Sequence, residues 1–178
     1  MIPSLKLFKE INSKILEIDN NQISDSIKII KDTIKKGNKI ILAGNGASSA
    51  IASHVAVDFT KNTRARAINF NETDLITCFS NDFGYENWIK KSLEYYSDYN
   101  DLVILISSSG NSLNIVKAAK YCKKNKLKLI TLSGMNWKNK ISNLGQVNFW
   151  VNSKSYNAIE TVHQAILLAL VEYFMTYN

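Results

Sequence analysis

Residues 102–112 read LVILISSSGNS, a short apolar run that ends abruptly in a loop of serines and glycine. An apolar run of this length, followed at once by a helical pattern, indicates a strand buried on both faces of a parallel sheet. The glycine permits a tight turn, and the next helix would direct its free N–H groups into the same loop. The sequence therefore predicts a phosphate-binding loop whose hydroxyl donors are Ser107, Ser108, Ser109 and Ser112.

A plainer interpretation also fits this loop, because Asn111 or Ser112 could simply cap the following helix. The rest of the chain favours a phosphate-binding role for this loop over helix capping alone. Three predicted strands end in small polar loops, GNGAS, SSSGNS and SG. In parallel sheets the carboxyl ends of the strands share one edge, where ligands bind. The loop at residues 44–49 lacks the third glycine of a dinucleotide fingerprint, and no strand is followed by GxxxxGK[ST], so we expect no nucleotide cofactor.

Helical and strand-like periodicity alternate along the whole chain. This alternation predicts an α/β fold: a doubly wound, flavodoxin-like, five-stranded parallel sheet with helices on both faces. We expect one domain of 178 residues, with a helical part at residues 1–37 and an α/β core at residues 38–178. The strands are predicted at residues 39–43, 65–70, 102–106, 127–132 and 147–151, and the main helices at residues 48–60, 74–79, 85–96, 113–125 and 158–174, with a turn at residues 81–84.

Composition narrows the function further. The two cysteines, Cys78 and Cys122, lie in apolar or helical patterns without zinc-binding spacing, as in a reduced cytosolic protein. The longest uncharged apolar stretch, residues 165–171, is too short to span a bilayer, and no signal peptide is evident, so a soluble cytoplasmic protein is expected. The net charge of +7 comes from scattered lysines, so we expect neither a nucleic-acid partner nor a membrane partner.

Several segments together resemble one known family. GNGASSAIASHVAVDF, NDFG, ISSSGNS, ITLSG and YNAIETVH resemble, in order and spacing, the SIS (sugar isomerase) domain proteins of the phosphoheptose isomerase group. The resemblance covers nearly the whole chain. It implies an intramolecular oxidoreductase that interconverts sedoheptulose 7-phosphate and a heptose 7-phosphate through an enediol. It also implies a homotetramer, with sites between subunits and the N-terminal helices in a central bundle.

The resemblance also implies roles for individual residues. The loop serines would hold the phosphate. The family's catalytic Glu corresponds to Asp58, and the family's metal-binding Gln and catalytic His correspond to Glu160 and Leu168. Catalysis would then depend on Asp58, Glu160 and His163. The same resemblance implies a zinc ion held by His54, Asp58, Glu160 and His163, and sugar contacts from Asn45, Ser48 and Asp82.

Two alternatives remain open at this stage. His163 lies on an otherwise apolar helical stretch, where a histidine is commonly a hydrogen-bonded core residue rather than a ligand. The replacement of the family's acid/base histidine by Leu168 is also compatible with a non-catalytic SIS module that binds a phosphosugar or regulates another protein.

Overall fold

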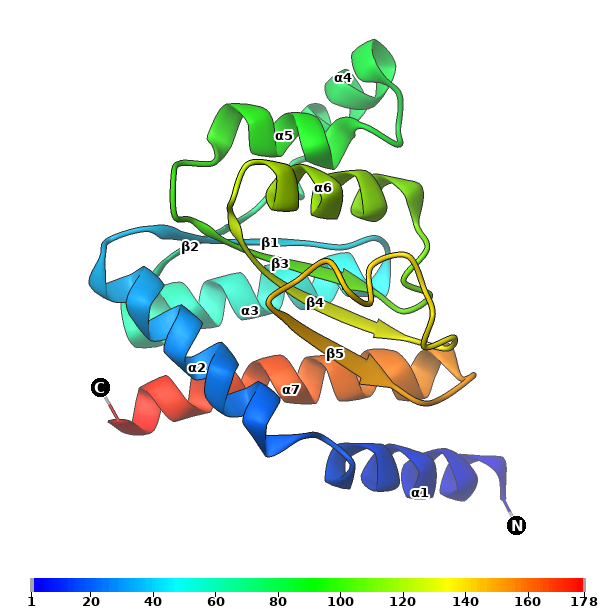
Figure 1. The fold of residues 1–178 in the computed structure, drawn as a ribbon. Helices are drawn as coiled ribbons and strands as arrows, with labels where there is room; N and C mark the ends of the chain where they lie inside the picture. Colours follow the sequence, from blue (N-terminus) through cyan, green and yellow to red (C-terminus); the bar gives the residue numbers. More distant parts are fainter. Residues whose placement is uncertain (1, 178) are drawn as a thin grey trace.

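A computed structural model, which describes residues 2–177, contains one parallel β-sheet between two layers of helices (Figure 1). The strand order is β2-β1-β3-β4-β5 with every pairing parallel, which confirms the flavodoxin-like topology. The order reverses between β1 and β3, so the carboxyl ends of these two strands flank the place where ligands bind in such sheets. The strands are β1 (Lys39–Ala43), β2 (Arg66–Asn69), β3 (Leu102–Ser107), β4 (Lys128–Gly134) and β5 (Val147–Val151).

The strands separate two hydrophobic cores. Alternate side chains of β1 show why: Ile40 and Leu42 join one core, whereas Ile41 and Ala43 join the other. Helices α2, α3 and α7 cover the first core and α5 and α6 the second (Figure 1). The helices are α1 (Pro3–Leu16), α2 (Asn20–Lys35), α3 (Ala47–Thr63), α4 (Thr73–Phe83), α5 (Trp88–Tyr96), α6 (Leu113–Lys124) and α7 (Tyr156–Tyr177).

The predicted elements are all present, and their ends shift by a few residues. The largest difference is at NDFG, predicted as a turn over residues 81–84. Helix α4 continues through Phe83, and only Gly84 leaves it, with φ of 84°. The rings of Phe79 and Phe83 pack edge to face at 5.6 Å, one helical turn apart, which stabilises the extended helix.

Helix α7 is a core helix. By length and composition alone it could cross a membrane, but half of its most apolar window is buried inside the protein. Val162, Ile166 and Leu170 on this helix are essentially inaccessible and pack in the first core. Its apolar character is therefore accounted for by packing against the sheet and α3.

Helix α1, like α4, contains no buried residue. It lies next to the N-terminal end of α7 (Figure 1). Leu5, Phe8 and Leu16 expose 48%, 62% and 78% of their surface, so an apolar face of this helix is open to solvent.

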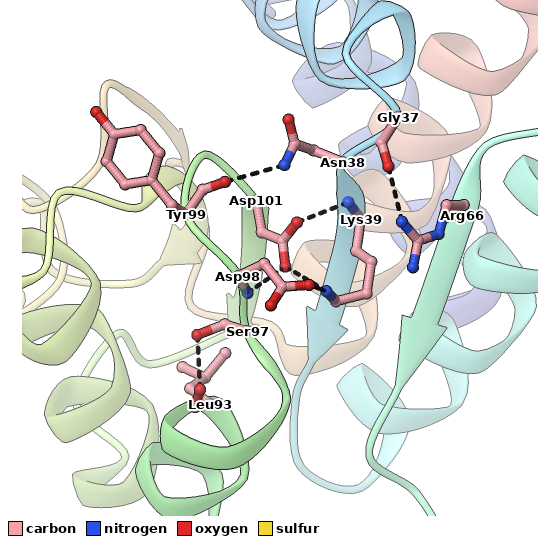
Figure 2. A network of polar contacts seen from close by, with 9 residues as sticks. All are labelled: Gly37, Asn38, Lys39, Arg66, Leu93, Ser97, Asp98, Tyr99 and Asp101. Carbon is pink, nitrogen blue, oxygen red and sulfur yellow. Dashed lines mark hydrogen bonds and ion pairs between the residues drawn. The ribbon is translucent and has the colours of Figure 1, made fainter.

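A polar network closes the edge of the sheet opposite the predicted ligand loops (Figure 2). The carboxylate of Asp101, fully buried before β3, accepts hydrogen bonds from the Lys39 N–H (2.7 Å) and the Asp98 N–H (2.8 Å). It also pairs with Lys39 Nζ at 2.9 Å, and Asp98 pairs with the same ammonium. Burial alone would lower the pKa of Lys39, but its bonds to Asp98 and Asp101 outweigh burial and raise it. The network fastens the start of β1 to the start of β3.

Candidate functional site

A small cavity of about 160 Å³ lies at the carboxyl ends of β1 and β3. Two of the three predicted polar loops, at residues 44–49 and 107–112, and the first turn of α7 form its wall. Ser107, Ser108 and Ser48 are nearly inaccessible to solvent although their side chains are polar. The cavity is lined by Asn45, Ser48, Ile106, Ser107, Ser108, Ser109, Ser112, Tyr156 and Glu160. The structure therefore brings together all of the predicted binding residues except Asp82.

The serine loop keeps its shape through its own hydrogen bonds. The Gly110 N–H donates to the Ser107 carbonyl at 2.8 Å, and the Asn111 N–H donates to Ser109 Oγ at 3.2 Å. Gly110 has a φ of 64°, and a Cβ there would lie 2.1 Å from Asn139 Oδ1. Only glycine fits this position, because the backbone is left-handed and the neighbouring amide leaves no room.

The capping interpretation of the serine loop does not hold. Ser112 precedes α6, but its side chain makes no capping hydrogen bond, and its Oγ lies 3.4 Å from Ser107 Oγ. The Asn111 amide bonds instead to the Ser109 carbonyl and the Lys140 N–H. The positive end of α6 and the serine hydroxyls are thus available to an anion in the cavity.

The first loop is fixed by a pair of amides. Asn45 Nδ2 donates to Asn114 Oδ1 at 3.0 Å, and Asn114 Nδ2 donates back to Asn45 Oδ1 at 2.8 Å. The Tyr85 hydroxyl donates to the same Asn45 oxygen at 3.1 Å. These bonds join the loop after β1 to the first turn of α6.

Glu160 connects the cavity to a larger groove of about 460 Å³ between α3 and α7. Its side chain lines both spaces, and its Oε1 accepts a hydrogen bond from Ser108 Oγ at 3.3 Å. The groove is lined by Ala47, Ala50, Ile51, His54, Asn157, Glu160, Thr161 and Gln164. A ligand anchored in the serine loop would therefore pass Glu160 before reaching His54.

The side chains of His54 and Asp58 are in contact along one face of α3. His54 Nε2 lies 3.1 Å from Asp58 Oδ2, as their spacing of one helical turn allows. His54 Nδ1 lies 3.2 Å from Gln164 Nε2 on α7. His54 lines the groove and is half exposed, whereas Asp58 is more enclosed and lies behind it. Gln164 was missed in the sequence, although its position one turn after Glu160 places it on the same helical face.

His163 lies elsewhere. It is fully buried, with Nε2 3.0 Å from the Ser133 carbonyl and Nδ1 without a hydrogen-bond partner. Burial lowers its pKa to about 4, although the bond to Ser133 acts in the opposite direction. His163 is a neutral core residue that lines neither the cavity nor the groove, so the structure does not support the predicted catalytic or metal-binding role.

Within one chain, Asp82 does not line the cavity either. It is exposed near the end of α4, where its carboxylate accepts hydrogen bonds from Asn81 and from the thiol of Cys78. Because α4 extends through Phe83, Asp82 is part of this helix and not of a loop.

The predicted metal ligands do not converge. Among residues 2–177, no three His, Cys, Asp or Glu side chains are grouped so as to hold a metal ion. His54 and Asp58 pair with each other, Glu160 bonds to Ser108, and His163 is in the core. The donor set of one chain thus does not fit the zinc site expected from the sequence.

Comparison with known proteins defines the class. A family model described as SIS domain matches residues 5–134. Proteins named phosphoheptose isomerase from Aliarcobacter butzleri and Fusobacterium nucleatum are 32% and 31% identical to the chain. The first alignment covers 87% of this chain and 85% of the relative, and the second 97% and 92%. The chain therefore belongs to the SIS domain family and, within it, to the phosphoheptose isomerase group.

Solved structures agree on the fold. A phosphoheptose isomerase from Francisella tularensis superposes with a TM-score of 0.88, at 21% identity, over 99% of this chain and 100% of the other. Phosphoheptose isomerase GmhA from Neisseria gonorrhoeae gives a TM-score of 0.87, at 21% identity, over 97% and 94%.

Proposed function

We propose that this protein is an aldose/ketose isomerase of phosphorylated sugars that interconverts sedoheptulose 7-phosphate and a heptose 7-phosphate. One observation carries the proposal. The serine-lined cavity and the groove share Glu160 as a common wall, so an anchored phosphate places the rest of a sugar beside acid–base side chains. The relatives named phosphoheptose isomerase support the same activity.

The cavity suits a phosphate that is bound without a cationic side chain. No Lys or Arg is among its lining residues, whereas serine hydroxyls and the N-terminus of α6 surround it. Hydrogen bonds to a charged oxygen are about twice as strong as neutral ones, and a helix N-terminus favours an anion. Asn45 and Ser48, from the first loop, would contact the part of the sugar next to the phosphate.

The reaction moves one proton between neighbouring carbons and another between their oxygens, through an enediol. Acid–base side chains near both atoms are needed for these transfers. Glu160 and the His54–Asp58 pair are the titratable groups at or directly behind the groove wall. They lie on two helices packed in the same core, so their separation is held by the fold.

The proposal is tested by mixing the purified protein with sedoheptulose 7-phosphate and following the aldose signals by NMR. The wild-type protein should convert the ketose. Ser108→Asp should reduce kcat/KM at least a hundredfold, because two like charges about 4 Å apart cost about 4 kcal/mol at an effective dielectric constant of about 20. Ser24→Asp, on the exposed surface of α2, is the matched control and should behave as wild type. A wild-type protein that leaves the ketose unchanged refutes the proposal.

A phosphosugar-binding module without catalysis is the second candidate. The observation that favours it is Leu168, which is packed against the hydrophobic core where the resemblance places an acid/base histidine. In the same experiment, tight binding of sedoheptulose 7-phosphate by a protein that neither converts it nor exchanges its hydrogens with D₂O would support this alternative.

We also propose a homotetramer located in the cytoplasm. The exposed apolar face of α1 supports assembly, because Leu5 and Phe8 would be covered by neighbouring copies. Native mass spectrometry should detect four chains, and Phe8→Asp should shift the protein toward smaller species. A wild-type protein that stays monomeric at micromolar concentration would contradict the assembly.

A further inference from the structure

The side-chain amide of Asn45 lines the cavity, but most of its hydrogen-bonding capacity is used within the protein. Its Oδ1 accepts two hydrogen bonds, from Asn114 Nδ2 at 2.8 Å and from the Tyr85 hydroxyl at 3.1 Å. An amide oxygen has two lone pairs, so none is left for a ligand. One N–H of Nδ2 donates to Asn114 Oδ1 at 3.0 Å, and the other has no partner among residues 2–177. Toward a ligand, this side chain is therefore a donor and not an acceptor.

The orientation of this amide is set from outside the cavity. An amide keeps nearly the same shape when its oxygen and nitrogen are exchanged, so its partners decide which way it points. Here the deciding partner is the backbone N–H of Ile115, which can only donate and lies 3.0 Å from Asn114 Oδ1. This bond fixes the amide of Asn114, and the reciprocal pair then fixes Asn45, because the exchanged orientation would place their two oxygens against each other.

The hydroxyl of Tyr85 adds a second constraint from a distant part of the chain. Tyr85 follows Gly84, where α4 ends, and it is 55% exposed. Asn114 lies in the first turn of α6 and is nearly inaccessible. Neither residue lines the cavity, so both are placed to influence a bound ligand through Asn45.

We infer that Asn114 and Tyr85 are positioning residues that determine specificity, because they hold the Asn45 amide so that it donates to an oxygen of the sugar next to the phosphate. This inference rests on the sugar phosphate ligand proposed above, but not on its isomerisation. The serine loop provides hydroxyl donors for the phosphate, which leaves the N–H of Asn45 for the first sugar oxygen beyond it. A hydroxyl or ester oxygen accepts this bond, whereas a protonated amino group at the same place can only donate and is rejected.

The test compares the binding of sedoheptulose 7-phosphate and of inorganic phosphate by calorimetry. Tyr85→Phe should weaken binding of the sugar phosphate about two- to tenfold, as expected for one neutral hydrogen bond, and leave the affinity for inorganic phosphate unchanged. Tyr99→Phe is the matched control, because it removes the hydroxyl of another exposed tyrosine, at the opposite edge of the sheet, and should bind both ligands as wild type does. In an active protein the sugar phosphate is an equilibrium mixture of ketose and aldose, which share the same phosphate end.

A double-mutant cycle tests whether Tyr85 acts through Asn45. Asn45→Ala should weaken binding of the sugar phosphate more than Tyr85→Phe does. In the Asn45→Ala background, Tyr85→Phe should have no further effect, because the amide that it orients is gone. Asn114→Leu should also weaken binding of the sugar phosphate selectively, and circular dichroism checks that this buried substitution folds. If it does not fold, Tyr85→Phe and the double-mutant cycle decide the matter alone.

The outcomes separate this inference from the proposed function. A protein that binds sedoheptulose 7-phosphate with the expected selectivity but does not convert it refutes the isomerase and supports the inference. Unchanged sugar phosphate binding by Tyr85→Phe overturns the inference, as does equal weakening of both ligands, because Asn45 would then donate to the phosphate itself. Additive losses in the double-mutant cycle also overturn it, because Tyr85 would then act independently of Asn45. A wild-type protein that binds no sedoheptulose 7-phosphate overturns both.

Discussion

Acid should destabilise this protein through His163 in particular. The ring is neutral and fully buried, and burial holds its folded-state pKa near 4 instead of the ordinary 6.5. Between these pH values the unfolded chain binds a proton that the folded protein does not, so stability falls as the pH falls. Above about pH 6.5 neither state is protonated at this residue and the effect vanishes.

The magnitude follows from the two pKa values of 6.5 and about 4. Each pH unit between them changes the free energy of unfolding by about 1.4 kcal/mol. The expected loss attributable to His163 is therefore about 2 kcal/mol at pH 5, and it approaches about 3 kcal/mol below pH 4. Such a loss is a sizeable part of the total stability of a folded domain, which is roughly 5–15 kcal/mol.

The assay is urea unfolding of wild type and His163→Gln from pH 7.5 to pH 4.5, at one fixed protein concentration. Glutamine stays neutral throughout and can still donate to the Ser133 carbonyl. The variant should lose less stability than wild type, by about 2 kcal/mol at pH 5. Taking this difference cancels the acid sensitivity of carboxylates common to both proteins. Parallel curves for wild type and His163→Gln would refute the reasoning.

Three further outcomes are expected. Gly110→Ala should cost about 1–3 kcal/mol of stability, measured by thermal unfolding, because of its positive φ and the contact with Asn139; an unchanged Tm would contradict this. Asp101→Ala should lower the free energy of unfolding by about 3–5 kcal/mol, measured with urea, because it removes a partner of the buried Lys39. A loss below about 1 kcal/mol, as for an exposed ion pair, would show that the network contributes little to stability. Ser108→Ala should weaken inorganic phosphate binding about tenfold or more by calorimetry, and unaltered affinity would exclude its hydroxyl from the anion site.

The centre of the sheet was predictable because β1, β3 and β4 are buried on both faces. Their apolar runs stand out without knowledge of neighbours, and the strand at residues 147–151 is found within the predicted bounds. NDFG was not predictable in the same way. Asparagine, aspartate and glycine favour turns locally, but the contact between Phe79 and Phe83 continues the helix to Phe83.

The serine loop was also predictable, because residues adjacent in sequence form it. The groove depends instead on the rotation of α7 against α3. One residue along a helix turns by about 100°, and this step separates His163 in the core from Gln164 at the groove. Since His163 is titratable and Gln164 is not, residue type alone favoured the wrong one of the two neighbours for contact with the groove.

The reciprocal amide pair between Asn45 and Asn114 has a consequence for ligand binding. The loop after β1 is held to the first turn of α6 by the protein itself, so the spacing between these two segments exists before any sugar binds. Less conformational freedom then remains to be lost when a small flexible molecule docks, and a larger share of the contact energy appears as affinity. Even a small ligand that contacts only the loop after β1 would bind to a site whose dimensions are already set.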